Sequence, residues 1–205
     1  LPEKRSFYRE EFVDTLDNGA IMAGRVASAA GTGLLSTLIN CFVQPLGDFI
    51  RGIVNGVPGI FEAINQAAET MARGGGVGYD FSAIRPQGAV VKGKASVASG
   101  PVSYMHVFDQ MCKTVSSAGN RRGAQMGVLR IDHPDVEHFI EEKSKQGHLT
   151  QFNVSVAVTD DFLSSLPSGE PFELVHEAEP GSDQIANGAF RRSDGKWVYQ
   201  SIDPK

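Results

Sequence analysis

Two glycine-bounded basic loops and one cysteine carry most of the chemistry that this sequence could perform. Residues 73–93 read RGGGVGYDFSAIRPQGAVVKG, in which four glycines within positions 74–78 are followed by Arg85 and Lys92. Glycines let the backbone approach a ligand closely and adopt positive φ. The neighbouring cations favour an anionic ligand, such as a nucleotide or a phosphate. A helix cap followed by a flexible loop is the alternative, because Gly74 also suits the C′ position of a helix.

The second loop, residues 116–123, reads SSAGNRRG. Arg121 and Arg122 lie between Gly119 and Gly123, where their guanidinium groups could hold a phosphate or stack on a base. A bare arginine pair is more often simply solvated. Its place at the end of an expected helix, in a loop of the same type as the first, favours a binding role.

The sequence context of the glycines excludes two common nucleotide motifs. A dinucleotide-binding GxGxxG follows a strand and opens a helix, whereas residues 74–78 follow an expected helix and enter an expected strand. The P-loop pattern GxxxxGK[ST] is absent. Any nucleotide site at this run is therefore of another kind.

Both cysteines, Cys41 and Cys112, have structural explanations on local grounds. Cys41 lies in TLINCFV (37–43), which predicts a buried strand, and Cys112 lies on the apolar face of an expected helix. Free cysteine is commonly a small buried hydrophobe. Two cysteines make no disulfide scaffold, so we expect a reducing, cytoplasmic setting.

A cluster of acidic and histidine residues after position 131 suggests a metal site at first sight. Its members are Asp132, His133, Asp135, Glu137 and His138. The start of a helix opened by Pro134 explains the acids equally well, since carboxylates are favourable near a helix N-terminus. No HExxH pattern is present. We therefore expect no metal site here.

The composition is that of an ordinary globular chain. It has 205 residues, 41% hydrophobic and 21% charged, with a net charge of −5. A negative chain has no global field for a nucleic-acid polymer, although a small anionic ligand needs only a local cluster of cations. No apolar run is long enough for a membrane span, and the first residues lack the hydrophobic region of a signal peptide.

Hydrophobic periodicity predicts alternating strands and helices through residue 166, which indicates an α/β unit. Residues 171–201 read as β-structure, with a hairpin turn at Asp194-Gly195. The expected helices begin near Ser6, Ile60, Pro101, Pro134 and Thr159, and the expected strands are 37–43, the run after Gly78, 125–131 and 152–158.

Four segments in this order closely resemble the catalytic subunit of ribonucleotide reductase, in particular the class II, adenosylcobalamin-dependent enzyme. They are NCFVQPLGD (40–48), ETMARGGGVGYDFSAIRPQGAVVKG (69–93), ASGPVSYMHVFDQMCKTVSSAGNRRGAQMGVLRIDHPDVEHFI (98–140) and LTQFNVSVAVTDDF (149–162). The similarity spans roughly residues 20–165 and weakens in the tail.

The resemblance implies an α/β fold, part of the barrel of parallel strands that this family builds in two halves. We expect an N-terminal helical or irregular segment (1–35), the first part of the barrel (36–166) and a β-hairpin extension (167–205). The family's finger-loop motif, Asn-Pro-Cys-Gly-Glu, is absent from the sequence. We therefore expect that this chain stops before the finger loop and lacks the thiyl cysteine.

For the active site, the resemblance implies that Cys41 is the first of two reducing cysteines. In this family a cofactor-derived thiyl radical activates the ribose, and two cysteines reduce its 2′ carbon and become a disulfide. Asn40 and Gly76 match positions that line the substrate ribose, and Arg121 is the expected substrate contact of the second loop. The implied cofactor of the complete enzyme is adenosylcobalamin.

For regulation, the resemblance implies a deoxynucleoside triphosphate effector at a dimer interface. Asp48, Arg85 and Lys92 match the first specificity loop, and Ser117 lies in the second. Lys92 stands where many relatives carry arginine, which keeps the charge but loses the bidentate fork.

The expected partners are a ribonucleotide, the effector, a thioredoxin-like reductant, the remaining C-terminal part of the enzyme and a second copy of the chain. The chain alone is expected to be inactive. The alternative is a non-catalytic effector-binding module, which would have no use for Cys41. A stand-alone thiol oxidoreductase is disfavoured because no CxxC is present.

Overall fold

The computed structural model describes residues 2–93, 96–115 and 123–204 of the chain. The helices within these ranges are α1 (Pro2–Asp17), α2 (Gly24–Ala29), α3 (Ile60–Ala72), α4 (Gly100–Thr114), α5 (Val136–Ser144), α6 (Asp160–Ser168) and α7 (Ser182–Ala186). The strands are β1 (Cys41–Val43), β2 (Ile53–Val54), β3 (Val57–Pro58), β4 (Gly76–Asp80), β5 (Gln125–Arg130), β6 (Phe152–Ala157), β7 (Phe172–His176), β8 (Phe190–Arg191) and β9 (Trp197–Ile202).

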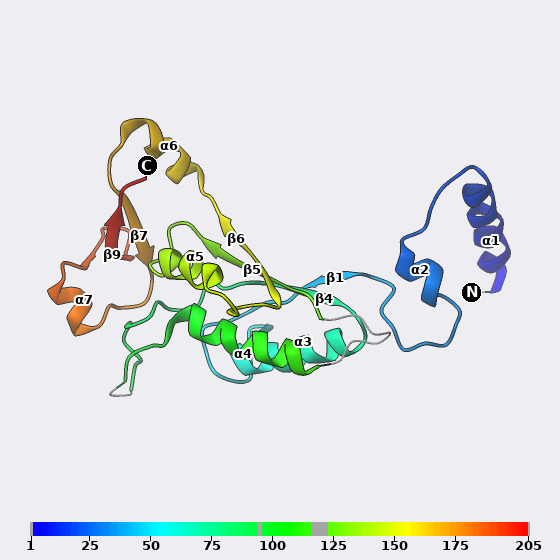
Figure 1. Cartoon of the computed structure of the whole chain (residues 1–205), viewed down its shortest axis with the longest axis horizontal. Coiled ribbons are helices and arrows are strands. Elements are labelled where there is room, and N and C mark those ends of the chain that lie inside the picture. Colours follow the sequence, from blue (N-terminus) through cyan, green and yellow to red (C-terminus); the bar gives the residue numbers. More distant parts are fainter. Residues whose placement is uncertain (1, 94–95, 116–122, 205) are drawn as a thin grey trace.

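A four-stranded parallel sheet organises the middle of the chain (Figure 1). Its strand order is β1-β4-β5-β6, so each neighbour along the chain is also a neighbour in space, apart from the small β2–β3 hairpin. Parallel neighbours need crossover connections, and here α3, α4 and α5 supply them. Consecutive parallel strands joined by helices are the arrangement from which an α/β barrel is built.

One face of the sheet is covered by helices. Val77 and Tyr79 in β4, Leu129 in β5 and Phe152 in β6 are buried, because side chains alternate between the two faces of a strand. They pack in one cluster with apolar residues of α3, α4 and α5. Phe108 of α4 meets the Tyr79 ring edge-on, with 4.7 Å between ring centroids.

A buried polar chain crosses this core. The Tyr79 hydroxyl donates to Oε1 of Gln125 over 3.0 Å, and Nε2 of Gln125 donates to the Phe108 carbonyl over 3.1 Å. Burial raises the pKa of Tyr79, so its hydroxyl keeps its proton and remains a donor. Hydrogen bonds as well as packing therefore hold β4, β5 and α4 in position relative to one another.

The opposite face of the sheet is open among the described residues. Cys41 and Val43 in β1 are exposed, and Met126, Asn153 and Ser155 lie exposed on the same side of β5 and β6. The strand expected at 37–43 is therefore shorter than predicted and not buried. It lies at the edge of the described sheet, where it pairs with β4 alone.

The expected signals are confirmed at α3, α4 and α6, whereas α1 begins at Pro2, four residues before the expected Ser6, and α2 and α7 were not expected. Gly74 has a φ of 85° after α3, as a C′ glycine should. Pro101 lies in the first turn of α4, and the Thr159 hydroxyl caps α6 by accepting from the Phe162 amide. The helix expected from Pro134 begins instead at Val136, because residues 131–135 form a turn.

The N-terminal helices α1 and α2 lie away from the sheet (Figure 1). The apolar residues of α1, among them Tyr8, Phe12 and Leu16, are about half exposed. None of the described helices is both long and apolar enough to cross a membrane.

The tail forms more than the expected hairpin. The predicted turn at Asp194-Gly195 does join β8 to β9, and β7 adds a third antiparallel strand in the order β7-β9-β8. The Val175 amide donates to the Asp132 carbonyl over 2.7 Å, which ties this small sheet to the loop after β5. The three-part division of the chain at residues 35 and 166 stays a prediction.

Candidate functional site

Cys41 lies at the first position of β1, with its thiol exposed on the open face of the sheet. It pairs in register with Gly76 of β4, and the Gly76 amide donates to the Asn40 carbonyl over 2.8 Å. The structure thus brings together three of the sequence-predicted residues: the cysteine, Asn40 and Gly76. The expectation that Cys41 is buried is wrong, because no described element covers this face.

The glycine run divides into positions with different roles. Gly74 needs positive φ to end α3, whereas a Cβ at Gly75 would lie 2.7 Å from Cγ2 of Thr70 and 2.9 Å from the Phe42 ring. A Cβ at Gly76 would instead meet only ordinary contacts, 3.6 Å from Sγ of Cys41. The first two glycines are therefore required by the fold, and the third keeps the space beside the thiol open.

The residues that follow the second basic loop lie beside this thiol. Arg121 and Ser117 lie outside the described residues. The described chain resumes at Gly123, and the Ala124 carbonyl accepts from the Val77 amide over 3.1 Å. A Cβ at Gly76 would lie 3.5 Å from that carbonyl oxygen, so the end of the loop is adjacent to the Cys41–Gly76 pair.

Cys112 has the structural role expected of it. Its side chain is buried on α4, and burial, followed by the nearby Asp109, raises the pKa of the thiol to about 11. A thiol held protonated in the core is a poor nucleophile. The two cysteines are both free.

The predicted effector residues Asp48, Arg85 and Lys92 line one pocket of about 950 Å³. Nε of Arg85 lies 2.7 Å from Oδ2 of Asp48, and the same guanidinium donates to the Val90 carbonyl over 2.9 Å. Lys92 is exposed and makes no ion pair with any described residue. Of these two cations, Arg85 is therefore held by its partners and Lys92 is available to a ligand.

Residues that the sequence reasoning missed complete this pocket. Tyr104 of α4, His176 of β7 and both Arg191 and Trp197 from the tail also line it. Arg191 and Trp197 are paired across β8 and β9. The hairpin turn at Asp194-Gly195 was the feature of the sequence that could have pointed to this pair, because a hairpin places the residues that flank its turn side by side on neighbouring strands.

The residues of the rejected metal cluster have other partners. Nε2 of His133 is within 2.9 Å of the Ile84 carbonyl, and burial lowers the pKa of this ring to about 4. Oδ2 of Asp135 accepts from the Gln87 amide over 2.8 Å, and burial raises the pKa of that carboxyl. Arg130 pairs with both oxygens of Asp132.

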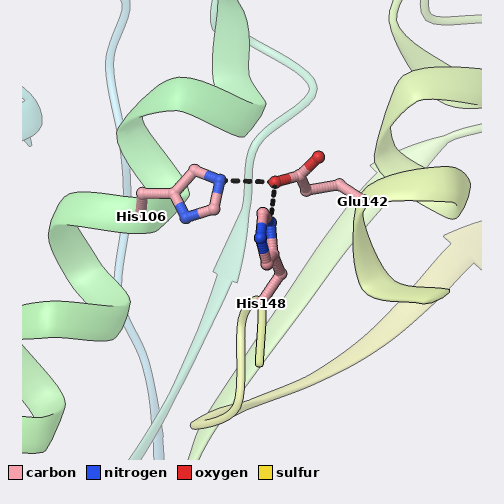
Figure 2. Close-up of side chains that lie close together, drawn as sticks. All are labelled: His106, Glu142 and His148. Carbon is pink, nitrogen blue, oxygen red and sulfur yellow. Dashed lines mark hydrogen bonds and ion pairs between the residues drawn. The ribbon is translucent and has the colours of Figure 1, made fainter. Parts of the chain in front are cut away.

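A different cluster does gather metal-ligating side chains, although no spacing in the sequence points to it. Figure 2 shows His106 of α4 and His148 of the α5–β6 connection pointing at one carboxylate oxygen of Glu142 in α5. Lys145, followed by His148, lowers the pKa of Glu142 to about 2, so the carboxylate stays ionised. The three residues are separated by 36 and 6 positions, which no local motif would join.

Comparison with known proteins identifies the sheet that carries Cys41. The profile described as the ribonucleotide reductase barrel domain matches residues 39–196. The chain belongs to the ribonucleotide reductase family. The expected resemblance is confirmed, and the parallel sheet with its helices is part of that α/β barrel.

Two curated relatives of the reductase chain are vitamin B12-dependent ribonucleoside-diphosphate reductases. The one from Thermoplasma acidophilum is 42% identical over 148 residues, which is 72% of this chain and 18% of the relative. The one from Mycobacterium tuberculosis strain CDC 1551 is 41% identical over 143 residues, 69% of this chain and 20% of the relative. The chain thus spans about a fifth of the length of these relatives.

A solved structure agrees on the fold. The class Id ribonucleotide reductase alpha subunit of Actinobacillus ureae superposes with a TM-score of 0.62 at 22% identity, covering 80% of this chain and 28% of that one. At 22% identity this likeness supports the fold alone.

The described residues near Cys41 do not identify a cobalamin contact. The space beside Gly76 is bordered by the Cys41 thiol and by the backbone carbonyls of Asn40 and Ala124. These groups suit the close approach of a sugar, but they are not a donor set that would single out a corrin ring.

Proposed function

We propose that this reductase chain supplies Cys41 as one of the two thiols that reduce a ribonucleotide to a 2′-deoxyribonucleotide. The observation that carries the proposal is the pairing of Cys41 with Gly76, which leaves the thiol exposed and the adjacent position free of any side chain. A ribose ring placed on this face would meet the thiol directly.

The chemistry requires a second thiol. As the ribose 2′ C–O bond breaks and water leaves, two thiols together supply two protons and two electrons, and their sulfurs join as a disulfide. A thioredoxin-like dithiol then restores both thiols by exchange. Cys112 is not the second thiol, because it is buried on the helix-covered side of the sheet. The second thiol and the thiyl cysteine belong to the remaining part of the enzyme.

Three residues are proposed to hold the substrate. Asn40 and Gly76 border the ribose beside Cys41, where the Asn40 side chain is exposed and free to donate to a sugar hydroxyl. Arg121 would contact the substrate from the second loop, whose end enters the sheet next to Gly76. The vitamin B12 dependence of the relatives supports adenosylcobalamin as the cofactor of the complete enzyme.

The pocket at Asp48 is proposed to bind a deoxynucleoside triphosphate effector. Its volume of about 950 Å³ suits a ligand of this size. Arg85, Lys92 and Arg191 supply positive charge for the phosphates, and the Tyr104 and Trp197 rings offer surfaces on which a base can stack. Ser117, in the second loop, would link this site to the substrate.

The proposed activity is tested by complementation. The chain alone, given adenosylcobalamin, a ribonucleotide and a dithiol reductant, is expected to show no turnover. Addition of the remaining part of the enzyme should restore deoxyribonucleotide formation. Cys41→Ser should abolish the restored activity, whereas Cys112→Ser should retain most of it. Turnover by the chain alone, or full activity of Cys41→Ser, would overturn the proposal.

The second candidate function is an effector-binding module without catalysis, and the cations and aromatic rings that line the pocket favour it. It predicts deoxynucleoside triphosphate binding that Lys92→Ala weakens, together with complementation that does not depend on Cys41. Binding alone does not separate the two functions, because Cys41→Ser should leave it unchanged in both. Dependence of restored turnover on Cys41 decides between them.

The remaining partners follow from the same proposal. A second copy of the chain would complete the effector site, and the two free cysteines agree with a cytoplasmic location.

A further inference from the structure

We propose that His106, Glu142 and His148 form a binding site for a divalent transition-metal ion of the Zn²⁺ type. This site is separate from the thiol and from the effector pocket. It joins α4, α5 and the α5–β6 connection on the helix side of the sheet.

The donor atoms already converge. Nε2 of His106 lies 2.7 Å from Oε1 of Glu142, and Nδ1 of His148 lies 2.5 Å from the same oxygen. All three donor atoms lie within 4.8 Å of one another. Tetrahedral ligands at about 2.0–2.1 Å from zinc lie roughly 3.3 Å apart, so each ring nitrogen needs to move away from Oε1 of Glu142 by less than about 1 Å to admit an ion.

The ring geometry favours coordination over stacking. The two imidazoles meet edge to face, with centroids 5.6 Å apart and an interplanar angle of 80°. Figure 2 shows a nitrogen of each ring directed at the carboxylate. Both histidine side chains are over 40% exposed, at 43% and 44%, which leaves a fourth coordination position accessible to water.

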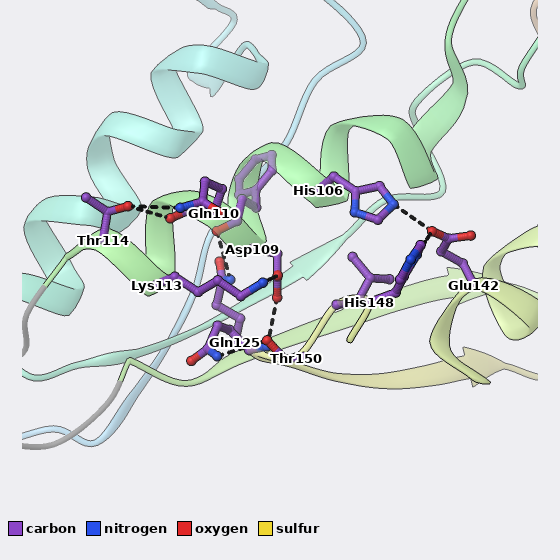
Figure 3. Close-up of polar contacts among 12 residues, drawn as sticks. His106, Asp109, Gln110, Lys113, Thr114, Gln125, Glu142, His148 and Thr150 are labelled. Atoms are coloured by element: carbon purple, nitrogen blue, oxygen red, sulfur yellow. Dashed lines mark hydrogen bonds and ion pairs between the residues drawn. The ribbon is translucent and has the colours of Figure 1, made fainter. Parts of the chain in front are cut away.

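The surrounding contacts fix these ligands in place. Nζ of Lys145 lies 2.7 Å from Oε2 of Glu142, which leaves Oε1 to the two imidazoles. Asp109 lies one turn after His106 on α4 (Figure 3) and accepts from the Gln151 amide over 2.7 Å, which ties α4 to the connection that carries His148. Hydrogen bonds that hold a ligating group in orientation are typical of metal sites.

The donor set selects the ion. Two imidazoles and one carboxylate match the ligands that zinc takes in proteins with an open fourth position. Calcium and magnesium prefer oxygen ligands, so neither is expected to bind tightly here. Binding would link two helices and the following loop, and it should therefore stabilise the folded chain.

Calorimetric titration of the chain with ZnCl₂ tests the site, in a Cys41→Ser background that removes a competing thiol. One ion per chain is expected. His106→Gln and His148→Gln should each weaken binding by more than the ~10–100-fold that loss of a supporting residue costs. At 100 times the dissociation constant, zinc should raise the melting temperature by about 5–10 °C.

His138→Gln is the matched control. Its Nε2 lies 3.7 Å from the other oxygen, Oε2, so its loss should leave zinc affinity unchanged. Co²⁺ should give the visible absorption of a four-coordinate site in the chain with the native histidines and lose it in His106→Gln. Circular dichroism establishes that the variants are folded. Zinc binding equal in the native site and both ligand variants, or no binding at all, would overturn the proposal.

Discussion

The two faces of the parallel sheet are built from the same strands but differ in what they carry. On the helix-covered face, three aromatic rings pack together: the centroids of Phe108 and Phe152 lie 4.7 and 6.1 Å from that of Tyr79. On the open face, Cys41 is exposed beside Gly76. The alternation of side chains along a strand thus separates residues that hold the fold from residues available to a ligand.

This contrast predicts that substitutions on the two faces have different consequences. Changes to the helix-covered face should lower the free energy of unfolding. Changes to the open face should leave stability nearly unaltered and alter the reactivity of the thiol.

The largest effect is expected for Phe108→Ala. The Phe108 ring is fully buried and meets both Tyr79 and Phe81, the latter at 5.5 Å between centroids. Its removal should reduce the free energy of unfolding by about 3–5 kcal/mol. Met126→Ala, on the open face, should cost less than ~1 kcal/mol in the same urea titration. Equal losses for the two variants would remove the distinction between the faces.

A second effect concerns pH. Burial lowers the pKa of His133 to about 4, whereas an unfolded chain binds this proton near pH 6.5. Between these values the unfolded state holds more protons, so stability should fall as pH drops from about 6.5 to about 4, by about 3 kcal/mol in total. His133→Gln should flatten this part of the profile. An NMR titration midpoint for the His133 ring near 6.5 would contradict the account.

The smallest and sharpest contrast lies within the glycine run. Gly75→Ala forces a methyl against Thr70 and Phe42 and should cost about 1–3 kcal/mol. Gly76→Ala meets only ordinary contacts, so its cost should stay below about 0.5 kcal/mol, while its methyl lies 3.6 Å from the thiol. Melting curves measure the stability of the two variants, and the rate of Cys41 alkylation measures the access of a reagent to the thiol. A slower alkylation in Gly76→Ala without loss of stability is the expected result.

Much of the fold could be predicted from the sequence, because local signals determine it. Pro101, Gly74 and the Thr159 cap mark helix ends in the expected places, and the alternating pattern in 152–158 gave β6. The exposure of Cys41 could not be predicted locally, since an apolar strand at the edge of a sheet has the same pattern as one in its centre.

The sites depended on contacts between distant residues. The pocket gains Arg191 and Trp197 from the tail, more than one hundred positions beyond both Asp48 and Arg85. The Glu142 cluster draws on two histidines from other elements. Neither arrangement has a short motif, so the tertiary fold alone brings these side chains together.

The central claim is that Cys41 is oxidised as the substrate is reduced. The most direct measurement is a single turnover of the reconstituted enzyme without external reductant, followed by alkylation of free thiols and peptide mass spectrometry. We expect Cys41 in a disulfide with a cysteine of the remaining part of the enzyme, and Cys112 as an alkylated thiol once the chain is denatured. Deoxyribonucleotide formation with Cys41 still recovered as a free thiol would contradict the account.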